Sequence, residues 1–534
     1  MTAARIMRLD RQLVRLLFAV AAVMAVQANA AVTLQHVWTH SAGGLGRAEI
    51  VAYDAAAQEF LVGNGTERCV MRLDALSGKE VGRFDVSAYG DPTSVAASHG
   101  LVAVAVVAPR KSDAGHVVLF RSATEKPVDN TSGKPVAVVR VGALPDMVTF
   151  TPNGRYLLSA NEGEPSDDYA SDPEGSISVI DVGNGAEHAI ALSADFLRFN
   201  TEREMLERQG VRITAPNANA TDGRATLAQD VEPEYIAVAP DGRTAWVTLE
   251  ENNALAVVDV ATARVEKIVG LGLKDHLRAA NGFDASDRDG DAGNGGIHIR
   301  RWPVFGMYQP DGIAAFVADG QTYLATANEG DSRGYAGFSD EARVKDLKLD
   351  ASLRVDDALD RLKVSRVGGD MDGDGDVDRL LAFGGRSLAI WNADGELLYD
   401  SGDALEQFIA KHLPERFNID EDGRNKIDDR SPDKGPEPEG VVVGSVGEST
   451  YAFVGLERTS AVAVFDVTRP ESAKLIDIVP LALEKNSTGG PHIAPEGLCF
   501  VPAKRSPLAA PLLAVAYEVT GTTILFRVDS VSAQ

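Results

Sequence analysis

Five strand-like segments of this chain begin with the same pair, a proline followed by an acidic residue, and a glutamate closes the strand that comes next. The prolines are Pro145, Pro233, Pro310, Pro438 and Pro495, and the closing glutamates are Glu162, Glu250, Glu329, Glu457 and Glu518. Each proline precedes its glutamate by 17 to 23 positions. Near-constant spacing between irregular gaps is typical of a structural repeat with loop insertions on one face.

The repeat predicts an all-β protein, a β-propeller with seven blades and acidic loop insertions. Proline suits the first residue of a strand because it lacks an amide hydrogen. Four-stranded blades around a channel leave only short, protected edges. Further strand patterns lie near residues 49–86 and 92–120, and the segment 32–38 is expected to complete the last blade. Two stacked β-sandwiches are the alternative, since length alone does not exclude them.

One domain is expected to span residues 31–534, with insertions at about 190–230, 275–305, 340–378 and 404–436. Helical patterns are scarce. Residues 193–209 and 404–413 are amphipathic and predict two short surface helices.

The first thirty residues have the pattern of a secretory signal peptide. Four arginines precede an apolar run at 16–26, and Ala28-Asn29-Ala30 supplies a small-x-small cleavage site. The run is short for a membrane helix, which needs about 20 apolar residues, although an uncleaved anchor is the alternative. The C-terminus shows no hydrophobic tail. We therefore expect a periplasmic or secreted protein without a membrane span after cleavage.

The formal net charge of −26 becomes −29 when residues 1–30, with four Arg and one Asp, are removed. Nucleic-acid binding draws on clustered Lys and Arg, so this balance argues against it and favours cations as partners. Cys69 and Cys499 are the two cysteines. They could form a disulfide in an oxidising compartment or remain buried thiols within strands.

An aspartate-rich loop at residues 370–378 is the sharpest candidate for a metal site. Its alternating carboxylates are Asp370, Asp372, Asp374, Asp376 and Asp378, with glycines at 373 and 375. Such spacing lets a short loop wrap a hard cation, so it predicts bound calcium. The loop resembles the first half of an EF-hand but lacks its closing glutamate. A solvated acidic loop is the alternative. A shorter copy contains Asp287, Asp289 and Asp291.

The repeat predicts a second acidic site. In a propeller, the start of each innermost strand and the end of the next strand lie at the same mouth of the channel. The residues after the five prolines should therefore meet the closing glutamates there; they are Asp146, Glu234, Asp311, Glu439 and Glu496. Such a ring would bind cations or keep several carboxyls protonated. Some members could instead cap turns.

Several longer segments resemble the choice-of-anchor I family. They are residues 160–168, 230–236, 302–308, 370–378 with 383–387, 429–431 with 434–440, and 455–458. The resemblance implies an exported propeller-like protein, similar to mesenchyme-specific cell-surface glycoproteins of animals that build mineralised skeletons. Many bacterial relatives are labelled alkaline phosphatase, and the strand starts resemble calcium-dependent phytase propellers. Family members often carry C-terminal anchors, and this sequence departs from that pattern.

Two functions follow as hypotheses. The first is a calcium-binding protein with a surface or mineral-related role, whose expected partners are metal ions or surface polymers. The second is a calcium-dependent phosphoesterase acting on phosphorylated small molecules at the channel mouth. Its metal ligands would be Glu162, Glu234, Glu329, Glu439, Glu457 and Glu496. Arg333 and Arg458 would hold the phosphate, although Arg458 could equally neutralise its glutamate neighbour.

Overall fold

The computed structural model describes residues 31–122, 133–217, 220, 223–290, 295–353, 355–420, 426–480 and 493–531. The predicted signal peptide and Asp291 therefore lie outside the described residues. Within the described part of the chain, no helix is long and apolar enough to cross a membrane.

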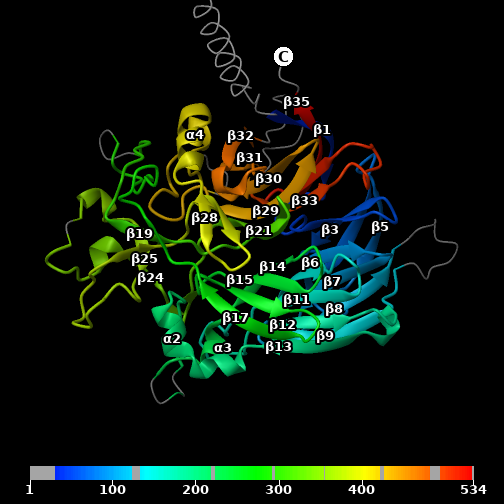
Figure 1. Ribbon diagram of the computed structural model, residues 1–534, viewed down its shortest axis with the longest axis horizontal. Helices are drawn as coiled ribbons and strands as arrows, with labels where there is room; N and C mark the ends of the chain where they lie inside the picture. Colours follow the sequence, from blue (N-terminus) through cyan, green and yellow to red (C-terminus); the bar gives the residue numbers. More distant parts are fainter. Residues whose placement is uncertain are drawn as a thin grey trace, which may run out of the picture.

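Seven four-stranded antiparallel sheets make up most of the molecule (Figure 1). In chain order they are β2 (Val51–Asp54), β3 (Glu59–Asn64), β4 (Cys69–Asp74) and β5 (Glu80–Asp85); β6 (Asp91–Ser98), β7 (Leu101–Val107), β8 (Ala114–Arg121) and β9 (Ala137–Ala143); β10 (Pro145–Phe150), β11 (Tyr156–Asn161), β12 (Ser176–Asp181) and β13 (Ile190–Asp195); β14 (Pro233–Val238), β15 (Thr244–Leu249), β16 (Ala254–Asp259) and β17 (Arg264–Gly270); β20 (Ile313–Ala318), β21 (Gln321–Asn328), β27 (Ser387–Asn392) and β28 (Leu397–Asp400); β29 (Pro438–Val446), β30 (Ser449–Leu456), β31 (Ala461–Asp466) and β32 (Lys474–Pro480); and β33 (Pro495–Val501), β34 (Leu512–Tyr517), β35 (Thr522–Val531) and β1 (Ala31–Ser41).

The seven sheets form a closed ring, in which each sheet is a blade. The first strand of every sheet contacts the first strand of the next, in the order β2, β6, β10, β14, β20, β29, β33 and back to β2. This arrangement confirms the predicted all-β propeller, and the number of sheets equals the number of blades expected. Strand β1 pairs with β35, as predicted, so the first and last of the described strands share the last blade.

The hydrophobic core lies between neighbouring blades. Phe84 of the first blade packs on Phe120 of the second, with ring centroids 4.6 Å apart, and Leu61 and Val104 are buried beside them. Because every blade is covered on both faces, its second strand is buried at most positions. All six residues of β34, for example, are buried. Unbroken apolar runs of this kind are expected for strands covered on both faces.

A further sheet, not expected from the sequence, lies outside the ring at the left of Figure 1. Its strands are β18 (Leu273–Asp275), β19 (Val304–Met307), β26 (Leu380–Ala382), β25 (Lys363–Ser365) and β24 (Glu341–Arg343). The predicted insertions 275–305 and 340–378 are therefore joined in one body, because β19 pairs with β26 in parallel. Phe283, Trp302 and Leu362 form its own core. A hairpin of β22 (Gly334–Tyr335) and β23 (Phe338–Ser339) also belongs to the fifth blade's insertion.

Helices are short and lie on the outside. They are α2 (Arg203–Arg208), α3 (Leu227–Asp230) and α4 (Ala404–His412), with 3₁₀ turns η1 (Ala186–His188), η2 (Leu197–Thr201), η4 (Val344–Asp346), η5 (Asp357–Leu359), η6 (Pro414–Arg416), η7 (Glu457–Thr459) and η8 (Pro470–Ser472). The predicted helix at 193–209 is partly wrong, because its first residues end strand β13 and the rest forms η2 and α2. The helix predicted at 404–413 matches α4.

Candidate metal centre at the channel mouth

The proline–acid pairs form β-bulges at one mouth of the channel. Pro145 pairs with Asn161, the last residue of the next strand, and the register then shifts before Val148 pairs with Ser159. The same shift follows the prolines that open β14, β29 and β33. A bulge re-aims the side chains within it. The closing glutamate directly follows the residue that pairs with the proline. The acidic residue after each proline therefore lies beside the closing glutamate.

The fifth blade differs from this pattern. Strand β20 begins at Ile313, so Pro310 and Asp311 lie in the connection before it rather than at its first residues. The residue before each of four prolines has a positive φ: Leu144, Gln309, Glu437 and Ala494, at 42° to 60°. Non-glycine residues rarely adopt this left-handed conformation. Its recurrence shows that the turn into the mouth is built in the same way in several blades.

Carboxylates from different blades approach one another closely at this mouth. Three groups each place ligand oxygens within 4.8 Å of one another: Glu234 with Glu250 and Asp311; Asp311 with Glu329 and Glu439; and Glu329 with Glu437 and Glu457. Asp311 and Glu329 each belong to two groups, so the three form one continuous arc. We call the arc and its continuation through Glu496, Glu518, Glu49, Asp146 and Glu162 the carboxylate ring.

Several ring oxygens are buried without a protein hydrogen-bond partner. They include the Oε2 atoms of Glu234, Glu439 and Glu496. A buried polar oxygen without a partner is costly. Carboxylate oxygens of this kind are the ligands that hard divalent cations take.

Burial and mutual repulsion raise the pKa values of the ring carboxyls. Burial, followed by the charges of Glu518 and Asp146, raises the pKa of Glu49 to about 8. Burial and Glu164 raise the pKa of Asp146 to about 7. The pKa of Glu439 is raised well above its ordinary value by burial and by Glu457. Without a cation, these groups keep their protons near neutral pH; a bound divalent ion would favour their ionised forms.

Lys434 supplies a fixed positive charge at one end of the arc. Its Nζ lies 2.7 Å from Glu329 Oε1, 3.1 Å from Asp331 Oδ1 and 3.8 Å from Glu437 Oε2. Burial alone would raise the pKa of Glu437, but Lys434, Arg430 and Arg458 outweigh it and hold that pKa at about 2. Glu437 is therefore an ionised anchor for three basic side chains rather than a proton-holding member of the ring.

The two arginines proposed as phosphate clamps have protein partners. Arg458 Nε donates to Glu437 Oε2 at 2.7 Å, and its Nη1 lies 3.3 Å from Glu457. This matches the neutralising role considered for it. Arg333 is fully buried, and its Nη2 donates to the Asp230 carbonyl at 2.6 Å while its Nε donates to Glu232 at 3.2 Å. Its guanidinium thus joins the fifth blade's insertion to α3 instead of facing the open mouth.

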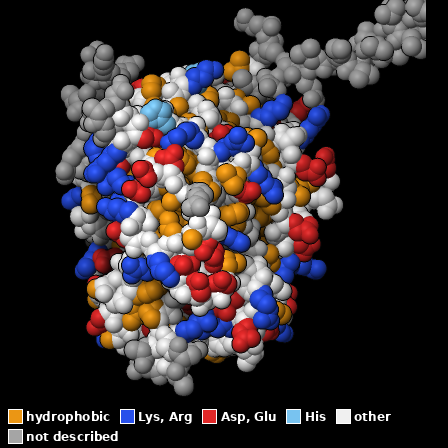
Figure 2. Space-filling view, turned by 90° about the vertical axis from the view of Figure 1, so that its left-hand side faces the viewer, with side chains coloured by type: hydrophobic (Ala, Val, Ile, Leu, Met, Phe, Trp, Pro, Cys, Tyr) orange, Lys and Arg blue, Asp and Glu red, His pale blue; other side chains and the backbone are white. Residues whose placement is uncertain are grey.

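The loop at 370–378 is an exposed turn that its own carboxylates hold together. Figure 2 shows the face of the molecule that bears the outer sheet, with acidic side chains gathered on it. Asp370 accepts hydrogen bonds from the amides of Gly373 and Gly375, at 2.7 and 2.9 Å, and these bonds lower its pKa. Both glycines have φ above 80°, which lets the chain turn around the carboxylate. Asp370, Asp372 and Asp374 form one close group.

Asp376 and Asp378 separate from the other three aspartates and form a second group with Asp350. An isolated bridge between Leu349 and Val377 brings Asp350 to the loop. Asp350 could not be predicted from the sequence, because its proximity depends on that pairing. The prediction of one five-aspartate cluster is thus resolved into two three-carboxylate groups.

The shorter copy of the motif is arranged differently. Asp287 forms a bidentate ion pair with Arg361, at 2.6 and 3.0 Å, which lowers its pKa against the effect of burial. Asp289 lies 3.0 Å from His298 Nδ1 and 3.9 Å from Arg300. Neither aspartate belongs to a close carboxylate group within the described ranges. Arg361 therefore balances the charge of Asp287.

The chain matches one protein-family model and is similar to known proteins of two animals. The model of the Choice-of-anchor I domain matches residues 49–470. The chain is 31% identical to Gigasin-3a of Magallana gigas over 191 residues, 33% of this chain and 67% of that protein. It is 25% identical to the mesenchyme-specific cell surface glycoprotein of Strongylocentrotus purpuratus over 338 residues, 55% of this chain and 42% of that one. It thus spans less than half of the sea-urchin protein.

Similar solved structures include Kuenenia stuttgartiensis hydrazine synthase, with a TM-score of 0.46 and 14% identity over 90% of this chain and 96% of that one. The β-propeller domain of Cps50 (Swd1) from Myceliophteria thermophila has a TM-score of 0.44 and 10% identity over 93% of this chain and 99% of that one. The propeller fold itself rests on the closed ring of sheets. Because the family model covers most of the chain, the protein belongs to the choice-of-anchor I family.

Proposed function

We propose that this protein is an exported calcium-binding β-propeller whose functional site is the carboxylate ring, with a binding role at a surface or in contact with mineral ions. The observation that carries the proposal is the continuous arc in which Asp311 and Glu329 are each shared by two carboxylate groups. Shared carboxylates can bridge neighbouring cations, and calcium accepts six to eight oxygen ligands in flexible geometry. The similarity to one cell surface glycoprotein supports the location.

The space at the mouth favours ions over organic ligands. A cavity of about 50 Å³ is lined by Asp146, Asp311 and Glu496, with Tyr235 on its wall. It has room for a few waters or for a partly hydrated ion. Pockets that hold organic ligands are usually about 300–1,000 Å³. This difference favours ion binding over turnover of a phosphorylated substrate within the ring.

Isothermal titration calorimetry with calcium tests the proposal. We expect the purified mature protein, stripped with EGTA, to bind calcium, and Asp311→Asn with Glu329→Gln to lower the number of ions bound. Glu448→Gln is the matched control, because this exposed acid lies outside the carboxylate groups. Unchanged stoichiometry in the ring variant, with the protein folded, would exclude the ring as the calcium site.

A calcium-dependent phosphoesterase is the second candidate. It is favoured by the same sharing of Asp311 and Glu329, because two adjacent cations can clamp both oxygens of a phosphoryl displacement. Lys434 beside Glu329 could balance added phosphate charge. Turnover of an aryl phosphate and of phytate should be measured with calcium and with EGTA. Calcium-dependent turnover that Glu329→Gln abolishes would replace the binding role with the enzymatic one.

A further inference from the structure

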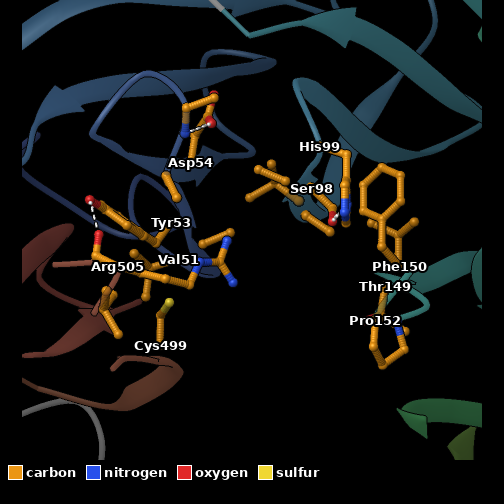
Figure 3. A pocket seen from close by; sticks show the side chains of 18 of the residues that line it. Val51, Tyr53, Asp54, Ser98, His99, Thr149, Phe150, Pro152, Cys499 and Arg505 are labelled. Carbon is orange, nitrogen blue, oxygen red and sulfur yellow. Dashed lines mark hydrogen bonds between the residues drawn. The ribbon is translucent and has the colours of Figure 1, made fainter. Parts of the chain in front are cut away.

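The opposite mouth of the channel holds a larger cavity of a different chemical kind. It has a volume of about 730 Å³ and is lined by residues 51–56, 95–100, 147–152 and 499–502, together with Arg505. These segments lie at the far ends of β2, β6, β10 and β33, whose starts lie beside the carboxylate ring. Blades one, two, three and seven thus share this cavity (Figure 3). Its volume lies within the range of pockets that hold organic ligands.

The loop after β33 presents Arg505 to this cavity. The Arg505 amide donates to the Pro502 carbonyl at 2.9 Å, and its carbonyl accepts a hydrogen bond from Tyr53 Oη at 3.1 Å. These bonds tie the loop to β2 in the first blade. The Arg505 side chain reaches toward the middle of the opening (Figure 3). Among the described residues, no acidic side chain forms an ion pair with it.

The other polar groups of the cavity leave this positive charge uncompensated. Asp54 also lines it, but its Oδ1 accepts hydrogen bonds from the amides of Ala56 and Ala57, at 2.9 and 3.3 Å, and the residue is buried. Burial raises the pKa of Cys499 to about 12, so its thiol stays uncharged. On the facing wall, His99 Nδ1 lies 2.8 Å from Ser98 Oγ.

Apolar side chains lie between these polar groups. Met147 and Phe150 line the cavity and are partly exposed, and alanines fill several of the remaining positions. An arginine above apolar walls suits a molecule with one anionic end, because a guanidinium can donate two parallel hydrogen bonds to a carboxylate or sulfonate.

We propose that this cavity binds an organic anion, a carboxylate or sulfonate carried on an apolar body, with Arg505 holding the anionic group and the walls holding the rest. This site is separate from the carboxylate ring and does not depend on calcium. It gives the propeller two ligand-binding ends, one for cations and one for an amphiphilic anion.

Fluorescence titration with 1-anilinonaphthalene-8-sulfonate tests the site, with N-phenyl-1-naphthylamine as the uncharged probe of the same shape. We expect saturable binding of the sulfonate to the mature protein at one site, with or without EGTA. Arg505→Gln should weaken sulfonate binding about ten- to hundredfold, the usual worth of a charge-assisted hydrogen bond, and leave the uncharged probe unaffected. Lys504→Gln, an exposed neighbour outside the cavity lining, is the matched control and should change neither probe.

A second variant tests the location independently of charge. Thr149→Trp places a large side chain on the cavity wall and should weaken both probes, while circular dichroism verifies that the protein remains folded. The proposal is overturned by either of two results: sulfonate affinity that Arg505→Gln leaves unchanged, or binding of both probes that Thr149→Trp leaves unchanged. Absence of saturable sulfonate binding to the parent protein would overturn it as well.

Discussion

Lys434 Nζ lies 2.7 Å from Glu329 Oε1, so a lysine side chain occupies the end of the carboxylate arc at which a further cation would otherwise be needed. Both side chains are nearly buried, with 10% of Lys434 and 13% of Glu329 exposed. Carboxylates and a lysine in such surroundings are strongly coupled, and removing one partner leaves a buried charge uncompensated. The ring therefore combines a built-in cation with carboxyls, such as that of Glu439, whose charged neighbours are other acidic side chains.

Lys434→Met should destabilise the calcium-free protein by about 2–4 kcal/mol, because Glu329 and Glu437 lose a buried partner. Calcium should restore part of this loss by taking over the charge compensation. Urea unfolding in EGTA and in calcium measures both effects. Lys426→Met, which removes an exposed lysine paired with Asp429, should change the stability by no more than about 0.5 kcal/mol. Equal stability of the two variants in EGTA would contradict the coupling.

The raised pKa values predict how calcium-free stability depends on pH. Glu49 and Asp146 have folded-state pKa values of about 8 and about 7, above those of an unfolded chain. The folded protein then holds more protons than the unfolded one between about pH 4.5 and 8. Stability should fall as pH rises through this window. Calcium should flatten the dependence, because it favours the ionised carboxylates.

Thermal melting between pH 5 and 8, in EGTA and in calcium, measures this difference. Calorimetry near pH 6.5, in buffers of different ionisation enthalpy, should also detect protons released on calcium binding. Glu49→Gln should reduce both signals because it removes one titrating group. A melting temperature in EGTA that rises with pH throughout this range would show that the ring carboxyls are not protonated in the folded state.

The repeat in the sequence predicted the ring because its members are tied to strand ends. A proline that opens a strand and a glutamate that closes the next one must lie side by side once the two strands pair, as Pro145 and Asn161 do immediately before Glu162. Glu49 escaped this reasoning since no proline precedes it, and Lys434 because its contacts depend on the path of an irregular loop. Residue type and spacing could not reveal either.

The outer sheet was beyond sequence reasoning for a related reason. Strands β19 and β26 are short, and at least 72 residues of chain separate them. They pair in parallel, so the sequence around them lacks the pattern of two adjacent strands joined by a turn. The same non-local pairing brings Asp350 to the aspartate loop. Arg361 likewise reaches Asp287, a predicted metal ligand, from another part of the insertion and forms an ion pair with it.

The aspartate loop provides a prediction that is separate from the ring. Asp372→Asn with Asp374→Asn should remove one calcium ion from the total and leave the binding that Asp311 and Glu329 support. Asp350→Asn tests the second group, which contains Asp376. Calorimetric stoichiometry distinguishes the sites, and the exposed Glu448→Gln is again the control. If the Asp372 and Asp374 double variant retains every ion of the parent, the loop is a solvated turn rather than a calcium site.

Trp38 should be a main determinant of ring closure. It belongs to β1 of the last blade, yet its ring packs on Phe60 of the first, with centroids 5.7 Å apart, and its Nε1 donates to the Ala75 carbonyl at 3.0 Å. Trp38→Ala should therefore cost about 3–5 kcal/mol, the usual loss for a buried tryptophan. Gln35→Ala, at an exposed position of the same strand, should cost no more than about 0.5 kcal/mol. Urea unfolding followed by circular dichroism measures both, and a Trp38→Ala protein as stable as the Gln35→Ala protein would show that the ring closes without this contact.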